Sequence, residues 1–114
     1  MVEQLINKLF AARTAAHIAH WKTKSYSQHQ ALGHFYDEVI DAVDKYVEAH
    51  QGAFGIVGKV EGEQPDIMQV IRDDILWINE NRAAIARDIP ALENILDEIS
   101  ALHMQTLYKL ENLR

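Results

Sequence analysis

Four of the five glycines in this chain of 114 residues fall between residues 52 and 62, at positions 52, 55, 58 and 62. Glycine disfavours helices because its backbone loses the most conformational freedom when it is fixed in one. The segments on either side of this cluster carry apolar residues three and four positions apart, which is the spacing of amphipathic helices. The sequence therefore predicts two helical halves joined by a long connection over residues 52–65.

The first half divides into two predicted helices. The segment "TKSYS" at residues 23–27 interrupts the apolar pattern, so we expect one helix over about 2–21 and a second over about 27–51. Along the second helix, an apolar stripe wide enough for a core contains Leu32, Phe35, Val39, Val43 and Tyr46.

The second half also divides into two predicted helices. Pro90 suits the first turn of a helix, so we expect helices over about 66–88 and 90–113. The links within each half are short and predict antiparallel hairpins, whereas the connection between the halves is long enough for a crossover. We therefore predict an all-α fold, a ferritin-like antiparallel four-helix bundle, as a single domain over residues 1–114.

The composition limits the chemistry of the chain. It has no cysteine, which excludes disulfides and thiolate metal sites, so any metal ligand must be His, Asp or Glu. The formal net charge is −6 and no cluster of Lys or Arg stands out, which argues against direct DNA binding. No apolar run approaches the roughly 18 residues of a membrane span. We expect a soluble, cytoplasmic protein that does not bind membranes.

Two pairs of residues on the first two predicted helices are candidate metal ligands. A tight hairpin brings His20 near His29, but Asp44 lies 15 residues beyond His29 on the same helix. At 1.5 Å per residue this is about 22 Å, too far for one site. A second copy, paired antiparallel about a two-fold axis, would bring Asp44 and Glu48 to the histidines. Such a mixed nitrogen and oxygen site suits iron, manganese or zinc.

These residues also carry a family resemblance. The pair "HW" at residues 20–21, followed by His29 and by "FYDEVIDAVDKYVE" ending at Glu48, resembles the Dps family of miniferritins. In that family a His-Trp pair ends the first helix and a His opens the second, and an Asp and a Glu then follow at the positions of Asp44 and Glu48. The segment "LDEISALHMQTLYKLENL" is more weakly similar to the last helix of the family. A short chain of this kind also resembles small ferritin-like proteins of tailed bacteriophages, which would act in the host-cell cytoplasm.

The resemblance implies iron chemistry. Members of the family form a ferroxidase centre between subunits, oxidise ferrous iron with peroxide or oxygen, and store the product in a hollow dodecamer. It implies that iron is held by His20, His29, Asp44 and Glu48, and that the chain forms a two-fold dimer or a higher homo-oligomer. His17 is a substitute ligand, because the segment between the His-Trp pair and the second histidine is shorter than in the family.

Gly33 stands where the family has an acidic ligand. This departure favours an alternative function: a non-enzymatic oligomeric interaction protein, phage-encoded, that keeps the ferritin-like bundle and has lost the metal site. It would bind a host protein or a small ligand through its acidic surface or the 52–65 connection. A glycine inside a helix also predicts the close approach of a neighbouring helix, as in a subunit contact.

The other histidines have simpler interpretations. His103 lies on the apolar stripe of the last helix, where we expect a core histidine with one hydrogen bond. His34 has Asp37 and Glu38 within one turn and is expected on a solvated ion-pair face. His50 lies near the end of the second predicted helix, where a protonated ring would interact with the helix dipole.

Overall fold

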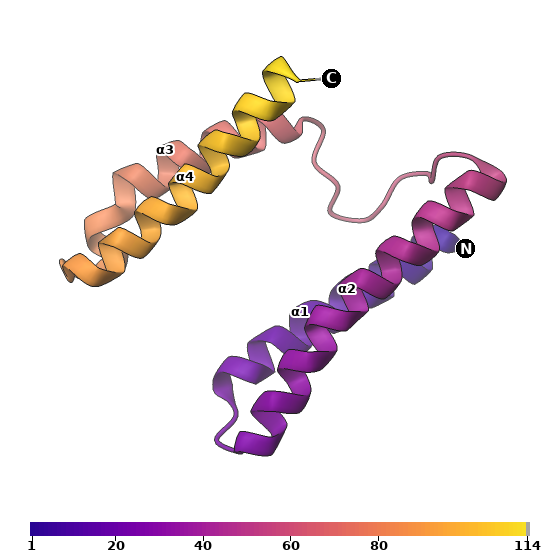
Figure 1. Cartoon of the computed structure of the whole chain (residues 1–114), viewed down its shortest axis with the longest axis horizontal. Helices are drawn as coiled ribbons and strands as arrows, with labels where there is room; N and C mark the ends of the chain where they lie inside the picture. Colours follow the sequence, from indigo (N-terminus) through magenta and orange to yellow (C-terminus); the bar gives the residue numbers. More distant parts are fainter. Residues whose placement is uncertain (114) are drawn as a thin grey trace. The chain divides into compact units, whose positions relative to one another are not determined.

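The computed structural model describes residues 1–113, and within this range it contains four α-helices and no strand (Figure 1). Each helix lies within a few residues of a range predicted from the sequence. The expectation of an all-α fold is therefore confirmed. The helices are α1 (Val2–Lys22), α2 (Tyr26–Phe54), α3 (Ile67–Ala86) and α4 (Pro90–Asn112).

The helices form two compact units. Residues 1–63 make one unit, in which α1 packs against α2, and the rest of the chain makes the other, in which α3 packs against α4. Each unit is a helical hairpin, as the short links predicted (Figure 1). The ferritin-like arrangement of all four helices in a single domain stays a prediction.

The α1–α2 hairpin has a small apolar core and a well-capped turn. Ile6 and Val43 are each 3% exposed, and Ala16 is also buried between the two helices. The turn ends at Ser25, whose side chain accepts a hydrogen bond from the backbone N–H of Gln28 at 3.3 Å. Serine is among the preferred residues at this position because it satisfies an otherwise unpaired helix N–H.

The second helix is longer than the sequence predicts. It continues through Gly52 and ends at Phe54, where Gly55 adopts a φ of 94°. A single glycine lowers helix stability by only about 1 kcal/mol, so Gly52 does not end the helix. The chain stops being helical only where a positive φ is needed, and Gly55 supplies it at no steric cost.

Residues 55–63, which we call the strap, run back along the α1–α2 hairpin. Three backbone N–H groups of the strap donate to side chains of the helices: Gly58 to Glu3 at 2.8 Å, Glu61 to Asn7 at 3.0 Å and Val57 to Gln51 at 3.2 Å. These contacts hold an irregular segment against regular helices. The strap is therefore a structured part of the first unit.

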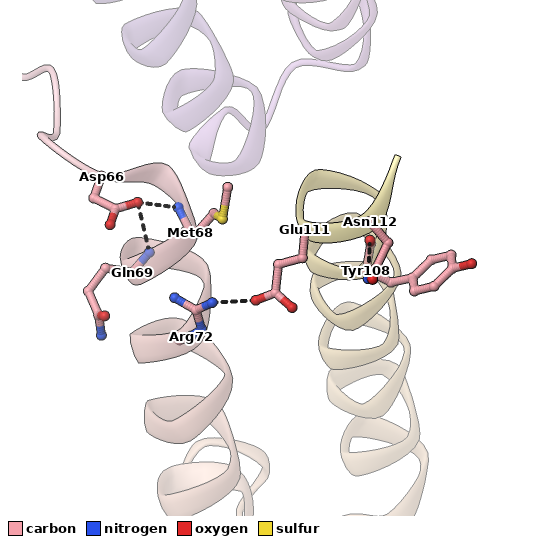
Figure 2. Close-up of polar contacts among 7 residues, drawn as sticks. All are labelled: Asp66, Met68, Gln69, Arg72, Tyr108, Glu111 and Asn112. Carbon is pink, nitrogen blue, oxygen red and sulfur yellow. Dashed lines mark hydrogen bonds and ion pairs between the residues drawn. The ribbon is translucent and has the colours of Figure 1, made fainter. Parts of the chain in front are cut away.

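The α3–α4 hairpin is held together partly by ion pairs. Asp66 caps α3 by accepting hydrogen bonds from the backbone N–H groups of Met68 and Gln69, and Arg72 of α3 pairs with Glu111 of α4 (Figure 2). Arg82 of α3 pairs with both Glu93 and Asp97 of α4. The buried residues between these helices are Ile71, Ala86 and Ser100.

Each hairpin leaves many apolar side chains exposed. On α4 they recur three and four positions apart, which places them on one face of the helix. None of the helices that the structure describes has an apolar stretch long enough to cross a bilayer. The exposed apolar face of α4 consists of Leu92 (45%), Ile95 (53%), Ile99 (40%) and Leu102 (61%).

Candidate metal centre

His20 and His29 lie side by side at the turn of the α1–α2 hairpin. Nδ1 of His20 donates a hydrogen bond to the backbone carbonyl of His29 at 2.6 Å. Nδ1 of His29 donates to the backbone carbonyl of His20 at 2.8 Å. The two rings stack, with centroids 3.6 Å apart and planes inclined by 18°. The sequence predicted this proximity from the short link between the helices.

The reciprocal hydrogen bonds fix the tautomer of both rings. A carbonyl oxygen can only accept, so Nδ1 carries the proton in each imidazole. In the neutral form Nε2 then keeps its lone pair and is available as a ligand atom. Metal-binding histidines are oriented in this way, with the second nitrogen donating to a carbonyl or a carboxylate. The pair therefore has the hydrogen bonding of metal ligands.

The stacking limits how the two rings can share an ion. A metal lies close to the plane of the imidazole that binds it, at about 2.1 Å from the nitrogen. One ion cannot lie in the planes of both rings, because the rings are nearly parallel and their centroids are 3.6 Å apart. In this arrangement the pair offers one nitrogen to an ion, and a second bond requires one ring to rotate.

Gly33 is required by the position of the His20 ring. A Cβ atom at residue 33 would lie 3.1 Å from Cε1 and 3.3 Å from Nδ1 of His20. The sequence predicted that a neighbouring helix would approach this glycine, as in a subunit contact. Here the close approach is made by a side chain of α1 from the same chain. The space that a side chain at residue 33 would need is filled by an imidazole.

His17 lies in the same ring cluster but is engaged in packing. Its ring stacks on Tyr36 with centroids 3.9 Å apart and lies 4.4 Å from the ring of Trp21. Its centroid is 6.3 Å from that of His20. His17 is therefore close enough to serve as a substitute ligand only if it leaves the Tyr36 stack.

The candidate carboxylates lie elsewhere on the same hairpin. Asp44 and Glu48 are exposed on α2, which is continuous from His29 to both residues. The helical rise of 1.5 Å per residue places Asp44 about 22 Å beyond His29. In the described part of the chain, no group of three or more His, Asp or Glu side chains could hold a metal. The site predicted between two copies stays a prediction.

Asp44 also lines a groove that the sequence does not predict. The groove runs between α1, α2 and the strap and has a volume of about 480 Å³. Its apolar wall includes Ile6, Phe10 and Val47, together with Val57 and Val60 of the strap. These two valines are the feature of the sequence that indicates the groove, because apolar residues in a glycine-rich connection are expected to pack against other apolar groups. The strap that forms one wall is held by Glu3, whose pKa is lowered by the hydrogen bond from the backbone N–H of Gly58.

The remaining histidines depart in part from their simple interpretations. His34 pairs with Glu38 at 3.2 Å, and both side chains are exposed, as expected. His103 makes two polar contacts where one was expected: Nδ1 donates to the carbonyl of Ile99, and Nε2 lies 3.2 Å from the carboxylate of Asp74. His50 does not lie at the helix end, because α2 is longer than predicted and ends at Phe54. Its ring lies near those of Tyr46 and Phe54.

The fold and the site define a small all-helical protein with a histidine pair at one hairpin turn and an acidic second helix. The chain belongs to a family of unknown function, DUF5856, whose sequence pattern matches residues 20–110. It is 30% identical over 112 residues to a protein of Enterobacteria phage T4 described as an uncharacterized 14.6 kDa protein in the mobD-ri intergenic region. The match covers 95% of this chain and 86% of the phage protein. No solved structure matches the chain.

Proposed function

We propose that the protein binds ferrous iron at a site shared by two copies of the chain. His20 and His29 of one copy and Asp44 and Glu48 of the other would be the ligands, the second histidine binding once its ring rotates out of the stack. Oxygen or peroxide would oxidise the iron at an open coordination position. Iron is then the substrate of a ferroxidase. The observation that carries the proposal is the reciprocal hydrogen bonding of the histidines, which leaves both Nε2 atoms without a proton in the neutral form.

The second copy is needed because one chain separates its nitrogen and oxygen ligands along α2. When two hairpins pair antiparallel about a two-fold axis, the histidine end of each meets the Asp44 end of the other. This pairing forms two identical sites, since every contact in a two-fold interface occurs twice.

The distribution of charge along the hairpin supports an antiparallel pairing. Residues 12–36, around the turn, contain three Lys or Arg and no Asp or Glu, whereas the rest of this unit, residues 1–11 and 37–63, contains eight Asp or Glu and three Lys. The turn of the hairpin is therefore basic and the other end is acidic. Antiparallel pairing places opposite charges together, and parallel pairing would place like charges together, which disfavours it.

We also propose that the two hairpins assemble into a ferritin-like bundle. The support is the exposed apolar face of α4, because soluble proteins rarely leave contiguous apolar patches of this kind uncovered. Small-angle X-ray scattering tests the arrangement. A compact monomer of this length should have a radius of gyration of about 13 Å, and separated hairpins would give a clearly larger value.

Anaerobic titration with Fe(II), followed by air or peroxide, tests the iron site. The unaltered protein should bind Fe(II) saturably and oxidise it faster than buffer does. The double variant Asp44→Asn/Glu48→Gln should lose saturable binding. The matched control Asp37→Asn/Glu38→Gln removes the same charge from the same helix and should keep it. Equal binding by both double variants would overturn the proposal.

A second candidate function is binding of a host protein without metal. Two observations favour it: the stacked rings do not converge on one ion, and the His20 ring fills the space next to Gly33. On this alternative the protein, purified without chelator, carries no stoichiometric metal and yet retains a specific protein partner. Metal analysis by mass spectrometry separates the two candidates.

A further inference from the structure

We propose that the groove between α1, α2 and the strap holds Trp21 of a second copy, with the lysines that follow Trp21 facing the acidic rim of the groove. This inference rests on the antiparallel pairing of two copies in the proposed function, but it does not depend on iron. It gives the groove an occupant and the exposed tryptophan a role.

The groove combines an apolar wall with an acidic rim. Ile6, Phe10 and Val47 are among its apolar lining residues, and two acidic lining residues, Asp44 and Glu61, are exposed to solvent and form the acidic rim. None of the described residues that line it is basic. Its volume of about 480 Å³ is within the range of sites that enclose small ligands or a large side chain. An occupant should therefore be apolar and followed by positive charge.

Trp21 has this chemistry at the other end of the same hairpin. Trp21 is 68% exposed, and Lys22 at the end of α1 and Lys24 in the turn follow it. Tryptophan is among the residues most enriched at the energetic centres of protein interfaces, because its large ring buries much apolar area. A tryptophan followed by two lysines complements an apolar groove with an acidic rim.

The helix geometry places Trp21 and the groove on the same face of the hairpin. Trp21 and Phe10 are eleven residues apart on α1, which is close to three full turns, so their side chains point to the same side. Phe10 lines the groove. The two features therefore share a face and lie at opposite ends of it, as a two-fold antiparallel contact requires.

The register of the proposed pairing also places Trp21 of one copy level with the groove of the other. The contact between His20 and His29 places the end of α1 level with the start of α2. A pairing that brings these histidines to Asp44 of the other copy therefore brings Trp21, the next residue, to the same level. Val43 and Val47, which line the groove, flank Asp44 at this level.

Tryptophan fluorescence of the full chain tests the inference. In a Trp77→Phe background Trp21 is the only tryptophan, so its emission reports on one position. As the protein concentration rises and sedimentation shows assembly, the emission should shift to the blue and quenching by acrylamide should decrease. Trp21→Ala should weaken assembly at least about tenfold, the effect of losing an interface anchor.

A charge exchange tests whether the groove is the place where Trp21 binds. Lys24→Glu and Glu61→Lys should each weaken assembly and raise quenching of Trp21, and the double variant should restore both. The side chain of Glu61 is suitable because the hydrogen bond to Asn7 uses only its backbone N–H. Glu98→Lys makes the same change of charge on α4 and should leave both measurements unchanged.

The outcomes separate this inference from the iron site. Assembly that leaves Trp21 as accessible to acrylamide as in the monomer overturns the inference and leaves the shared iron site standing. The inference is also overturned if Trp21 is already shielded from acrylamide in the monomer, or if its shielding is the same in Lys24→Glu, Glu61→Lys and the double variant. Shielding on assembly with restoration by the double variant supports it, even in a protein that binds no iron. A chain that stays monomeric at every concentration overturns both proposals.

Discussion

The imidazole of His20 occupies the space that a side chain at Gly33 would need, with Cε1 of the ring 3.1 Å from the position of a Cβ atom. The ring is also held by its hydrogen bond to the carbonyl of His29. The absence of a side chain at residue 33 and the placement of the histidine pair are therefore linked. Any larger residue at this position has to move His20.

This link predicts opposite outcomes for two glycines of the same helix. Gly52→Ala should raise the free energy of unfolding by about 1 kcal/mol, because nothing lies within 4 Å of the added Cβ and alanine favours the helix. Gly33→Ala should show no such gain and should shift the imidazole NMR signals of His20. Equal gains measured by chemical denaturation would show that the His20 ring does not limit the space at residue 33.

Ser100 predicts a stabilising substitution in the α3–α4 hairpin. Its side chain is 5% exposed, and its hydroxyl is buried without a hydrogen-bond partner among the described residues. Ser100→Ala should therefore raise the free energy of unfolding by about 1 kcal/mol. Ser25→Ala removes the cap of α2 and should lower it by about 1 kcal/mol. A loss of stability in Ser100→Ala would show that the hydroxyl has a partner.

The hydrogen bond from Arg82 lowers the pKa of Asp97 below its ordinary value. The contribution of this pair to the free energy of unfolding is therefore fully present above the ordinary pKa of aspartate and is lost as the pH falls through the lowered pKa. Arg82→Met should return the pKa of Asp97 toward its ordinary value, as measured by NMR titration, and should remove this part of the acid dependence. Lys109→Met removes a positive charge from the same hairpin and should leave the Asp97 titration unchanged.

The anchoring of the strap by Glu3 predicts a pH-dependent exchange of one amide. The hydrogen bond from Gly58 lowers the pKa of Glu3, so the contact persists above the ordinary pKa of glutamate and weakens as the pH falls through the lowered value. Glu3→Ala should speed hydrogen exchange of the Gly58 amide at neutral pH. Glu3→Gln keeps an acceptor oxygen but has no titrating group. In this variant the protection of the Gly58 amide from hydrogen exchange should therefore not change over this acid range. Identical exchange in all three proteins would mean that Glu3 does not hold the strap.

The sequence predicts the elements of this fold better than their tertiary contacts. Apolar periodicity and the "TKSYS" break place all four helices within a few residues, and the short first link places His20 beside His29. The sequence does not predict the end of α2, because glycine content alone does not separate Gly52, which stays helical, from Gly55, which adopts a positive φ.

The strap and its groove could not be predicted from local pattern. They depend on Glu3 and Asn7, which lie more than fifty residues from the amides that they bind. The role of Gly33 follows only in part from the sequence, since a glycine inside a helix indicates a close contact without showing which group makes it. The stacking of the two imidazoles is likewise a tertiary feature, because it depends on how α1 and α2 meet.

Complementation between two inactive variants tests the shared iron site most directly. His20→Ala/His29→Ala lacks the nitrogen ligands and Asp44→Asn/Glu48→Gln lacks the carboxylates, so neither should bind Fe(II) saturably alone. After equal amounts are mixed and reassembled, random pairing should restore about a quarter of the original sites, because each mixed dimer contains one intact site. Mixed dimers, verified by mass spectrometry, that bind no iron would contradict the claim that the site is built from two copies.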